Sequence, residues 1–331
     1  MKQGILEAYR DRIERGLSRA LHGHAPLRAL LRYHIGLEDE TGAPARATGK
    51  WLRPSLVLFV AEQLGGASDV ALSSAVGLEL IHGFSLIHDD IQDRDRVRRG
   101  RPAVWTICGI EQAINAGDLM HTLAIAAALD SSPTAANCLI RATQQMIEGQ
   151  SQDLDFERRT VTSNEYLTMV DRKTGALLRC AFELGGIAAE AEDRVLATLT
   201  ALGQAVGRAF QIQDDLLGIW GNDDMLGKAT GSDIRRRKKT LPIVQLFEHA
   251  RGEDAAVLET IYDGDGDRDL PPEDVARVIE HLDALGIRAG CEALVHKHLD
   301  EALHRLADLP FDDSAHDRMR ELIEFLARRQ K

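Results

Sequence analysis

Two groups of aspartates in this chain have the type and spacing of ligands for a divalent cation. Asp89, Asp90 and Asp93 form the first group, and on a helix Asp89 and Asp93 would lie one turn apart on one face. Three neighbouring carboxylates repel one another, and Mg²⁺ would relieve the repulsion because it binds carboxylates together with phosphate oxygens. A solvated helix end capped by aspartates gives the same pattern, so this group alone leaves both interpretations open.

The second group, Asp214 and Asp215, ends another apolar stretch of the chain. Two acidic groups on separate helices could face each other across a cavity. Opposed carboxylates could then share several Mg²⁺ ions around one diphosphate. A single pair of aspartates has little meaning, whereas two such groups on comparable apolar helices point to a metal–diphosphate site.

Basic residues adjoin both acidic groups. Lys50 and Arg53 lie at a predicted loop-to-helix junction, which suits phosphate binding. The runs that follow the two acidic groups are Arg94, Arg96, Arg98, Arg99 and Arg101, and then Lys228 with Arg235, Arg236, Arg237, Lys238 and Lys239. An isolated basic run is more often a solvated face or a nucleic-acid patch. In a chain of net charge −12, alternating acid and base favours metal–diphosphate over nucleic acid.

Helices are expected to position these residues. Leu80, Phe84, Ile87 and Ile91 form an apolar stripe with helical spacing, which predicts a helix over residues 72–93. Helical patterns are also predicted from residue 111, over 138–154, 166–183 and 198–220, from 241, and in two stretches that finish the chain. No segment shows sustained strand alternation and no linker stands out. One all-α domain over residues 1–331 is therefore expected.

The composition agrees with helices and with a reducing compartment. Aromatic residues make up 5% of the chain and only nine prolines occur, while Ala and Leu are frequent. The cysteines are far apart, without a Cys-x-x-Cys pair, which favours small buried side chains over a zinc site. Charges interrupt residues 1–21, and no apolar run reaches the roughly 20 residues of a membrane span. We therefore expect no signal peptide, no integral membrane segment and a cytoplasmic location.

Together the motifs resemble the trans-isoprenyl diphosphate synthases, also called polyprenyl synthetases. The resemblance runs from Gly49-Lys50 to Leu241-Pro242, well over half of the chain. Its motifs are the first acidic group with Arg98-Arg99-Gly100, Glu148-Gly149-Gln150 with Asp153, Lys173-Thr174, and Phe210-Gln211 before Asp214-Asp215. It implies a bundle of mostly antiparallel helices around a deep central cavity, usually as a homodimer.

The resemblance also implies a role for each matching residue. Ligands of the Mg²⁺ ions, three per active site with Mn²⁺ as a substitute, would be Asp89, Asp90, Asp93, Asp214 and Asp215. Side chains holding the allylic diphosphate would be Arg98, Lys173, Lys228 and Lys238. Isopentenyl diphosphate would be held by Lys50, Arg53, His82 and Arg99. The residues lining the reaction centre would be Thr174 and Gln211.

The implied reaction is a head-to-tail condensation of isopentenyl diphosphate with an allylic diphosphate. Breaking the allylic C–O bond leaves a carbocation and a diphosphate, and metal ions and cationic side chains stabilise the charge on that leaving group. The isopentenyl double bond attacks the cation, and a proton then leaves to the departing diphosphate. A lone histidine is more often a packing or surface residue, but His82 lies two turns before Asp89 on the same face, which favours a role at the site.

Two positions depart from the family pattern. Gly218 stands where the second acidic motif often has a third aspartate, and Asp233 is a candidate to replace it. Arg237 stands where a glycine usually precedes the lysine that matches Lys238. Asp263–Asp267 resembles the start of a calcium loop, but Arg268 occupies the position that needs glycine, so a solvated loop is expected.

Product length is expected to depend on Phe84 and Ser85, which lie about one turn before the first acidic motif. A large ring at Phe84 would floor the cavity while Ser85 leaves room, which resembles synthases that stop at the C20 geranylgeranyl product. A C15 farnesyl product is the alternative. Two further alternatives are a class I terpene cyclase, which would not need Lys50, Arg53 and His82, and a non-catalytic regulatory subunit, which tends to lose acidic residues.

Overall fold

Helices account for almost all regular structure in the computed structural model, which describes residues 4–45, 49–221, 231–262 and 269–327. The expected all-α class is confirmed. Lys228 and the Asp263–Asp267 motif lie outside the described residues. The four cysteines are free thiols. Cys138, Cys180 and Cys291 are buried as expected, whereas Cys108 is only partly buried.

The chain packs as two compact units. The first comprises Met1–Gln144, Leu177–Thr200 and Leu309–Met319, and the second comprises Gln145–Ala176, Ala201–Asp308 and Arg320–Lys331. The helices with residues in both units are α8 (Pro133–Phe156), α10 (Ala176–Ala188), α11 (Asp193–Trp220) and α18 (Asp313–Ala327). The single domain expected over residues 1–331 stays a prediction.

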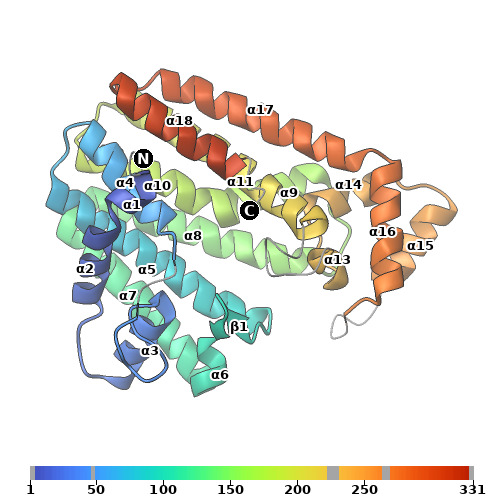
Figure 1. The fold of residues 1–331 in the computed structure, drawn as a ribbon, viewed down its shortest axis with the longest axis horizontal. Coiled ribbons are helices and arrows are strands. Elements are labelled where there is room, and N and C mark those ends of the chain that lie inside the picture. The colour runs from blue at the N-terminus through green and yellow to red at the C-terminus, as the bar shows by residue number, and fades with distance from the viewer. Residues whose placement is uncertain (1–3, 46–48, 222–230, 263–268, 328–331) are drawn as a thin grey trace. The chain divides into compact units, whose positions relative to one another are not determined.

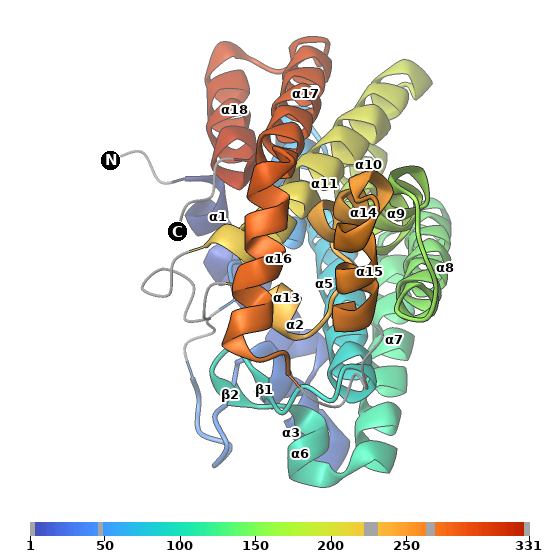
Figure 2. The ribbon, with the colours of Figure 1, turned by 90° about the vertical axis from the view of Figure 1, so that its right-hand side faces the viewer.

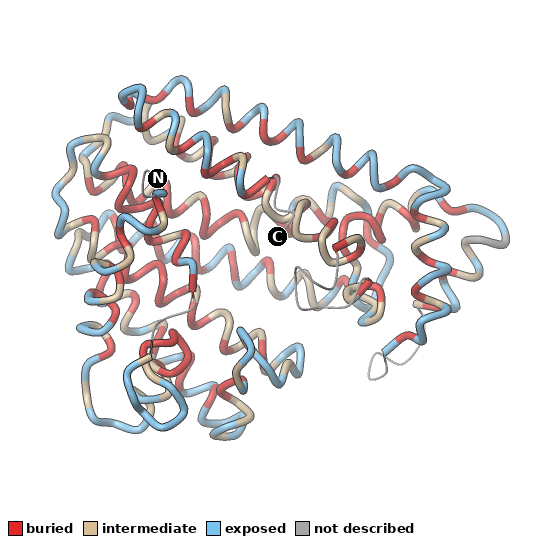
Figure 3. Tube along the Cα trace, viewed as in Figure 1, coloured by how far each residue is buried: buried red, intermediate tan, exposed pale blue. Residues whose placement is uncertain are grey.

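The first unit is built around the long helix α5. The elements that lie wholly in this unit are α1 (Ile5–Ala8), α2 (Arg10–Ala20), α3 (Pro26–Ile35), α4 (Leu52–Gln63), α5 (Ser68–Gln92), β1 (Val97–Arg98), β2 (Arg101–Pro102), α6 (Val104–Cys108) and α7 (Ile110–Ser131). α5 lies alongside α7 (Figures 1 and 2). A Cβ at Gly77 would meet the carbonyl oxygen of Ala124 at 2.8 Å, so glycine is what lets the two backbones approach here. Buried positions follow α4 and α5 (Figure 3).

Helix α5 is longer and more apolar than we expected from the sequence, in which no apolar run was judged long enough to span a membrane. Within the described parts of the chain it alone has the length and hydropathy of a membrane span, with a mean hydropathy of 1.6. Two thirds of that window, 67%, is buried inside the structure. Burial in the core of a folded unit explains such an apolar helix, so it is weak evidence for a span.

The segment after α5 forms a hairpin that the sequence did not predict. Val97 pairs with Pro102 and Arg98 with Arg101. Between them Arg99 has φ 53° and Gly100 has φ 74°, the positive values that a tight two-residue hairpin turn requires. The turn brings Arg98 and Arg99 back towards the end of α5.

The second unit contains a π-helical turn, which directly follows α9. Its own elements are α9 (Ser163–Val170), η1 (Asp171–Gly175), α13 (Ser232–Arg235), α14 (Leu241–His249), α15 (Glu253–Tyr262), α16 (Pro272–Ala284) and α17 (Ile287–Ala307). The single helix expected over 166–183 is therefore three segments, α9, η1 and α10. Three helices rather than two finish the chain, because Gly286 with φ 66° separates α16 from α17.

Candidate active site

The first acidic group lies at the C-terminal end of α5, where its three carboxylates have different surroundings. Asp89 is half-buried and Asp93 is exposed. Asp90 is 1% exposed, and its Oδ1 accepts a hydrogen bond from Arg98 Nε at 2.8 Å. Its buried Oδ2 has no hydrogen-bond partner. Burial raises the pKa of Asp90, and the hydrogen bond and charge of Arg98 oppose that rise.

A cationic group in the same unit brings together residues from three elements. Arg53 lies in the first turn of α4, and its Nη1 is 3.2 Å from His82 Nε2 on α5. Because guanidinium can only donate, His82 Nε2 is the acceptor and the ring is neutral. Burial first, and then Arg53 and Arg99, hold the pKa of His82 well below its usual range. A Cβ on Gly49 would lie 3.4 Å from Arg99 Nη1, so the guanidinium at the hairpin tip reaches the loop that carries exposed Lys50.

A buried acid, Glu79, lies beside this cationic group and was not predicted from the sequence. Glu79 is 3% exposed and lies one turn before His82 on α5. Burial raises its pKa to about 7, while the charges of Arg99 and Arg53 lower it. The available signal was a lone charged residue in the middle of an apolar stretch.

A buried histidine was missed as well. Burial, and then Arg99 and Arg98, lower the pKa of His34 to about 3, and its Nε2 has no hydrogen-bond partner. A cavity of only about 20 Å³ lies there, and its lining includes His34, Arg98 and Arg99.

The two residues expected to set product length lie on α5, one turn before the acidic group. Phe84 is 7% exposed and packs against the rings of His88 and His121. Ser85 donates from its hydroxyl to the carbonyl of His82 at 2.8 Å, a bond within its own helix. The bulky side chain at this level of α5 is therefore Phe84.

The second unit holds a hydrogen-bonded chain around Asp215. Thr174 Oγ1 donates to Gln211 Oε1 at 2.7 Å, and Gln211 Nε2 donates to Asp215 Oδ1 at 3.0 Å. Asp215 Oδ2 accepts from the Tyr166 hydroxyl at 2.6 Å and from the Leu241 backbone N–H at 3.1 Å. Asp215 is 3% exposed, and burial raises its pKa to about 7 against these three hydrogen bonds.

The geometry of η1 fixes the Lys173-Thr174 pair. Lys173 Nζ lies 2.5 Å from Asp153 Oδ2 on α8. A Cβ on Gly149 would collide with the backbone of Lys173, so glycine lets α8 touch η1 directly. Asp171 accepts two hydrogen bonds from Arg208, at 2.7 and 2.6 Å. A π-turn inside a helix often marks a functional site, and this one carries two predicted site residues.

The two departures from the family pattern have structural explanations. The Asp233 carboxylate, on α13, fills the space that a side chain at Gly218 would need, so an acidic group lies beside the position of the missing aspartate. Arg237 has φ 53°, which is the backbone conformation that a glycine adopts without strain. Its Nε donates to the Ile261 carbonyl at 3.0 Å. Lys238 is exposed, and its backbone N–H donates to the Asp233 carbonyl at 2.9 Å.

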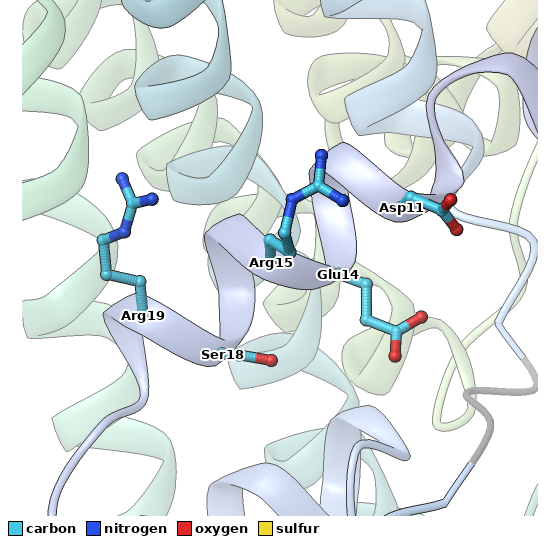
Figure 4. Close-up of a pocket in the computed structure, with 5 residues that line it drawn as sticks. All are labelled: Asp11, Glu14, Arg15, Ser18 and Arg19. Atoms are coloured by element: carbon cyan, nitrogen blue, oxygen red, sulfur yellow. The ribbon is translucent and has the colours of Figure 1, made fainter.

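A surface pocket of about 510 Å³ lies away from the predicted residues. Its lining residues, Asp11, Glu14, Arg15, Ser18 and Arg19, all belong to α2. The labelled side chains point in different directions along one helix and do not converge on a common point (Figure 4). It does not form a candidate site.

The donor set in each unit suits Mg²⁺ that is completed by other ligands. In the described part of the chain, no three His, Cys, Asp or Glu side chains converge closely enough to form a metal site on their own. Mg²⁺ typically keeps waters and takes phosphate oxygens beside one or two carboxylates. The unpartnered Oδ2 of Asp90 and the accessible Asp89 and Asp93 fit such an incomplete site. Asp215 uses three of roughly four acceptor positions, which leaves one.

Comparisons with known proteins agree with this arrangement. Residues 39–282 match the family model of polyprenyl synthetase. The chain is 37% identical over 310 residues to a farnesyl diphosphate synthase of Mycobacterium tuberculosis, covering 92% of this chain and 86% of that protein. It is 35% identical over 317 residues to a geranylgeranyl diphosphate synthase of the same species, covering 93% and 89%.

A solved structure extends the likeness to the fold. The polyprenyl synthetase from Streptomyces coelicolor A3(2) superposes with a TM-score of 0.87 at 34% identity, covering 97% of this chain and 98% of that one. The sequence and the fold therefore point to the same family. The chain belongs to the polyprenyl synthetase family and is a short-chain trans-prenyl diphosphate synthase, a prenyltransferase of isoprenoid biosynthesis.

Proposed function

We propose that this protein condenses isopentenyl diphosphate with an allylic diphosphate, head to tail and with Mg²⁺, to give the C20 geranylgeranyl diphosphate. The observation that carries the proposal is a separate cationic group formed by Arg53, His82 and Arg99 in the unit that also holds the first acidic group. A condensation needs room for two diphosphates, whereas a class I terpene cyclase ionises one. The chain keeps five aspartates in its two acidic groups, which argues against a regulatory subunit.

The residue roles follow from charge and position. Asp89, Asp90 and Asp93 in one unit, and Asp214 and Asp215 in the other, would ligate Mg²⁺. Mg²⁺ bound there would neutralise the charge that develops on the departing diphosphate. Side chains that would hold the allylic diphosphate are Arg98, Lys173, Lys228 and Lys238, and those that would hold isopentenyl diphosphate are Lys50, Arg53, His82 and Arg99. The neutral ring of His82 would donate a hydrogen bond from Nδ1 rather than add a charge.

Thr174 and Gln211 would face the allylic carbon that becomes cationic. Thr174 donates to Gln211 at 2.7 Å, which leaves hydroxyl lone pairs free to stabilise positive charge. The bond from Gln211 to buried Asp215 would keep the amide in one orientation. The carbon–carbon bond then forms as the isopentenyl double bond attacks, and the released proton would pass to the diphosphate that has left.

A C15 product is the second candidate, because a relative at 37% identity is named a farnesyl diphosphate synthase. Phe84 is the residue on which the choice depends, since its ring would close the proposed cavity.

We also propose that the protein is a homodimer in the cytoplasm that does not bind nucleic acid. Exposed apolar side chains on α6 and α7, Ile107, Ile110 and Ile114, support a face that is covered in solution.

The test is product analysis with purified full-length protein, Mg²⁺, isopentenyl diphosphate, and dimethylallyl, geranyl or farnesyl diphosphate in turn. We expect a C20 diphosphate, lost with chelator or in Asp89→Ala. A C15 product would still support the condensation reaction but would contradict the proposed C20 product length. Conversion of an allylic diphosphate without isopentenyl diphosphate would favour the cyclase, and no conversion by folded protein would favour the regulatory subunit.

A further inference from the structure

The ring of Phe84 lies between two imidazole rings from neighbouring helices of the first unit. His88, one turn further along α5, has its ring centroid 4.8 Å from that of Phe84, with an interplanar angle of 71°. His121 on α7 has its centroid at 5.2 Å, with an angle of 41°. Ring pairs prefer tilted or edge-to-face arrangements, so each of these contacts favours one orientation of the Phe84 ring. The orientation of Phe84 therefore depends on both histidines.

The imidazole of His88 packs directly against the backbone of α7 at a glycine. A Cβ at Gly117 would overlap the His88 ring, so the imidazole occupies space that only glycine leaves open. His88 Nε2 also lies 3.4 Å from the Ile114 carbonyl and 3.8 Å from Asp118 Oδ1. The ring next to Phe84 is thus fixed from α7 as well as from α5.

The helix that carries Phe84 is tightly packed at the preceding residue. At the preceding residue, Gly83, a Cβ would meet Met120 Sδ at 2.6 Å and Ile35 Cδ1 at 3.0 Å. Helix α5 is therefore tightly packed against α7 and α3 at the residue next to Phe84. His121 is only half-buried, and burial lowers its pKa, which keeps the ring uncharged. His121 is therefore the neighbour whose removal would free the Phe84 ring.

We propose that His121 and His88 are specificity-determining positioning residues, which set product length by holding Phe84 across the end of the substrate cavity. The proposal rests on the proposed function and on Phe84 as the floor. The acidic motif fixes where the diphosphate lies, so a ring held rigidly below it would fix how many isoprene units fit. If His121 is shortened, Phe84 can turn into the vacated space and the floor drops.

The experiment compares His121→Ala, Phe84→Ala and the double variant, with wild type and Thr122→Ala alongside. Thr122 is the next residue on α7, is exposed, and donates its hydroxyl to a carbonyl of its own helix at 2.9 Å, so it is a matched control. Full-length proteins are incubated with Mg²⁺, isopentenyl diphosphate and farnesyl diphosphate. Product lengths are measured by mass spectrometry after dephosphorylation, together with KM for isopentenyl diphosphate.

We expect His121→Ala to raise the share of products longer than the main wild-type product about fivefold, with KM for isopentenyl diphosphate nearly unchanged. Thr122→Ala should match wild type. The double variant should resemble Phe84→Ala alone, because His121 acts through Phe84. His121→Phe retains an aromatic ring and should keep the wild-type product, which serves as the test if His121→Ala does not fold.

Each contrary result points to a different error. An unchanged product from His121→Ala, or a lengthened one from His121→Phe, would overturn the positioning role while Phe84→Ala still lengthens the chain. Additive lengthening in the double variant would mean that His121 is itself a floor residue and would also overturn it. If Phe84→Ala leaves the products unchanged, Phe84 does not close the cavity. If the wild-type protein catalyses no condensation, the proposed function itself is wrong.

Discussion

Glu79 is a buried acid in the middle of the apolar helix α5. Burial raises its pKa to about 7 from an ordinary 4.5, and Arg99 and Arg53 only partly oppose this. Between these values the folded protein holds a proton that the unfolded chain has lost. The unfolding free energy should therefore fall as pH rises from about 4.5 to about 7.

Glu79→Gln removes this titration and should flatten the fall. The difference between the two proteins, measured as the change in unfolding free energy from pH 5 to pH 8 in urea, should be on the order of 3 kcal/mol. Asp215, whose pKa is also about 7, contributes with the same sign in both proteins and cancels. Equal slopes in wild type and Glu79→Gln would mean that Glu79 is ionised throughout.

The Tyr166 hydroxyl is the second residue-level case. It donates to buried Asp215 at 2.6 Å, and burial together with Asp215 raises its own pKa, so it stays a donor at all working pH values. Tyr166→Phe leaves a buried acceptor with one partner fewer, which should lower the unfolding free energy by about 1–3 kcal/mol. Urea unfolding checks this, and an unchanged midpoint and slope would show that the bond adds nothing.

Packing between helices depends on glycines, of which only Gly149 was part of a motif recognised in the sequence. Gly149 on α8 meets the backbone of Lys173 in η1, and Gly207 on α11 lies close to Gly175, where a Cβ would be 2.9 Å from the Gly175 Cα. These two close approaches, from α8 and from α11, fix the position of the η1 turn that carries Lys173 and Thr174. The motif Glu148-Gly149-Gln150 is therefore a close-approach site as well as a sequence marker.

Gly149→Ala should destabilise the protein although alanine is the better helix former. Overpacking costs about 1–3 kcal/mol, and because the added Cβ would lie 2.4 Å from the backbone nitrogen of Lys173, we expect a cost above the roughly 1 kcal/mol gained in helix propensity. Gly290→Ala on α17 is the matched control, because the nearest atom to its Cβ would be Gln245 Oε1 at 3.9 Å, and it should stabilise. Thermal unfolding compares the two, and a stabilised Gly149→Ala would contradict the close approach.

The sequence predicted helices well where apolar periodicity was strong. The stripe Leu80, Phe84, Ile87 and Ile91 led to a helix over 72–93, and α5 is Ser68–Gln92. The hairpin at Arg99 was missed because its two-residue strands carry no alternation, and η1 because a π-turn leaves the apolar pattern nearly intact. Glu79 and His34 were missed because a buried charge is defined by partners far away in sequence.

At the scale of the whole molecule, charge is the property that the proposed reaction uses. The net charge is −12, so an anionic substrate is repelled at long range and must be attracted by local cations and metal. The unit with α5 provides Asp89, Asp93 and the Arg53–His82 pair, and the other provides Asp214 and Lys173. Each unit thus holds both acidic and basic residues among those assigned to the reaction.

Binding of metal and diphosphate should therefore be mutually dependent. With an unreactive allylic thiolodiphosphate at about 100 times its dissociation constant, Mg²⁺ should stabilise the protein by about 2.7 kcal/mol, seen as a rise of several degrees in Tm. Mg²⁺ alone should give little, because the acidic groups form only partial sites without phosphate oxygens. Asp89→Asn should lose most of the rise, and chelator should reverse it in wild type. A rise with the analogue that persists in chelator would instead assign diphosphate binding to the arginines and lysines alone.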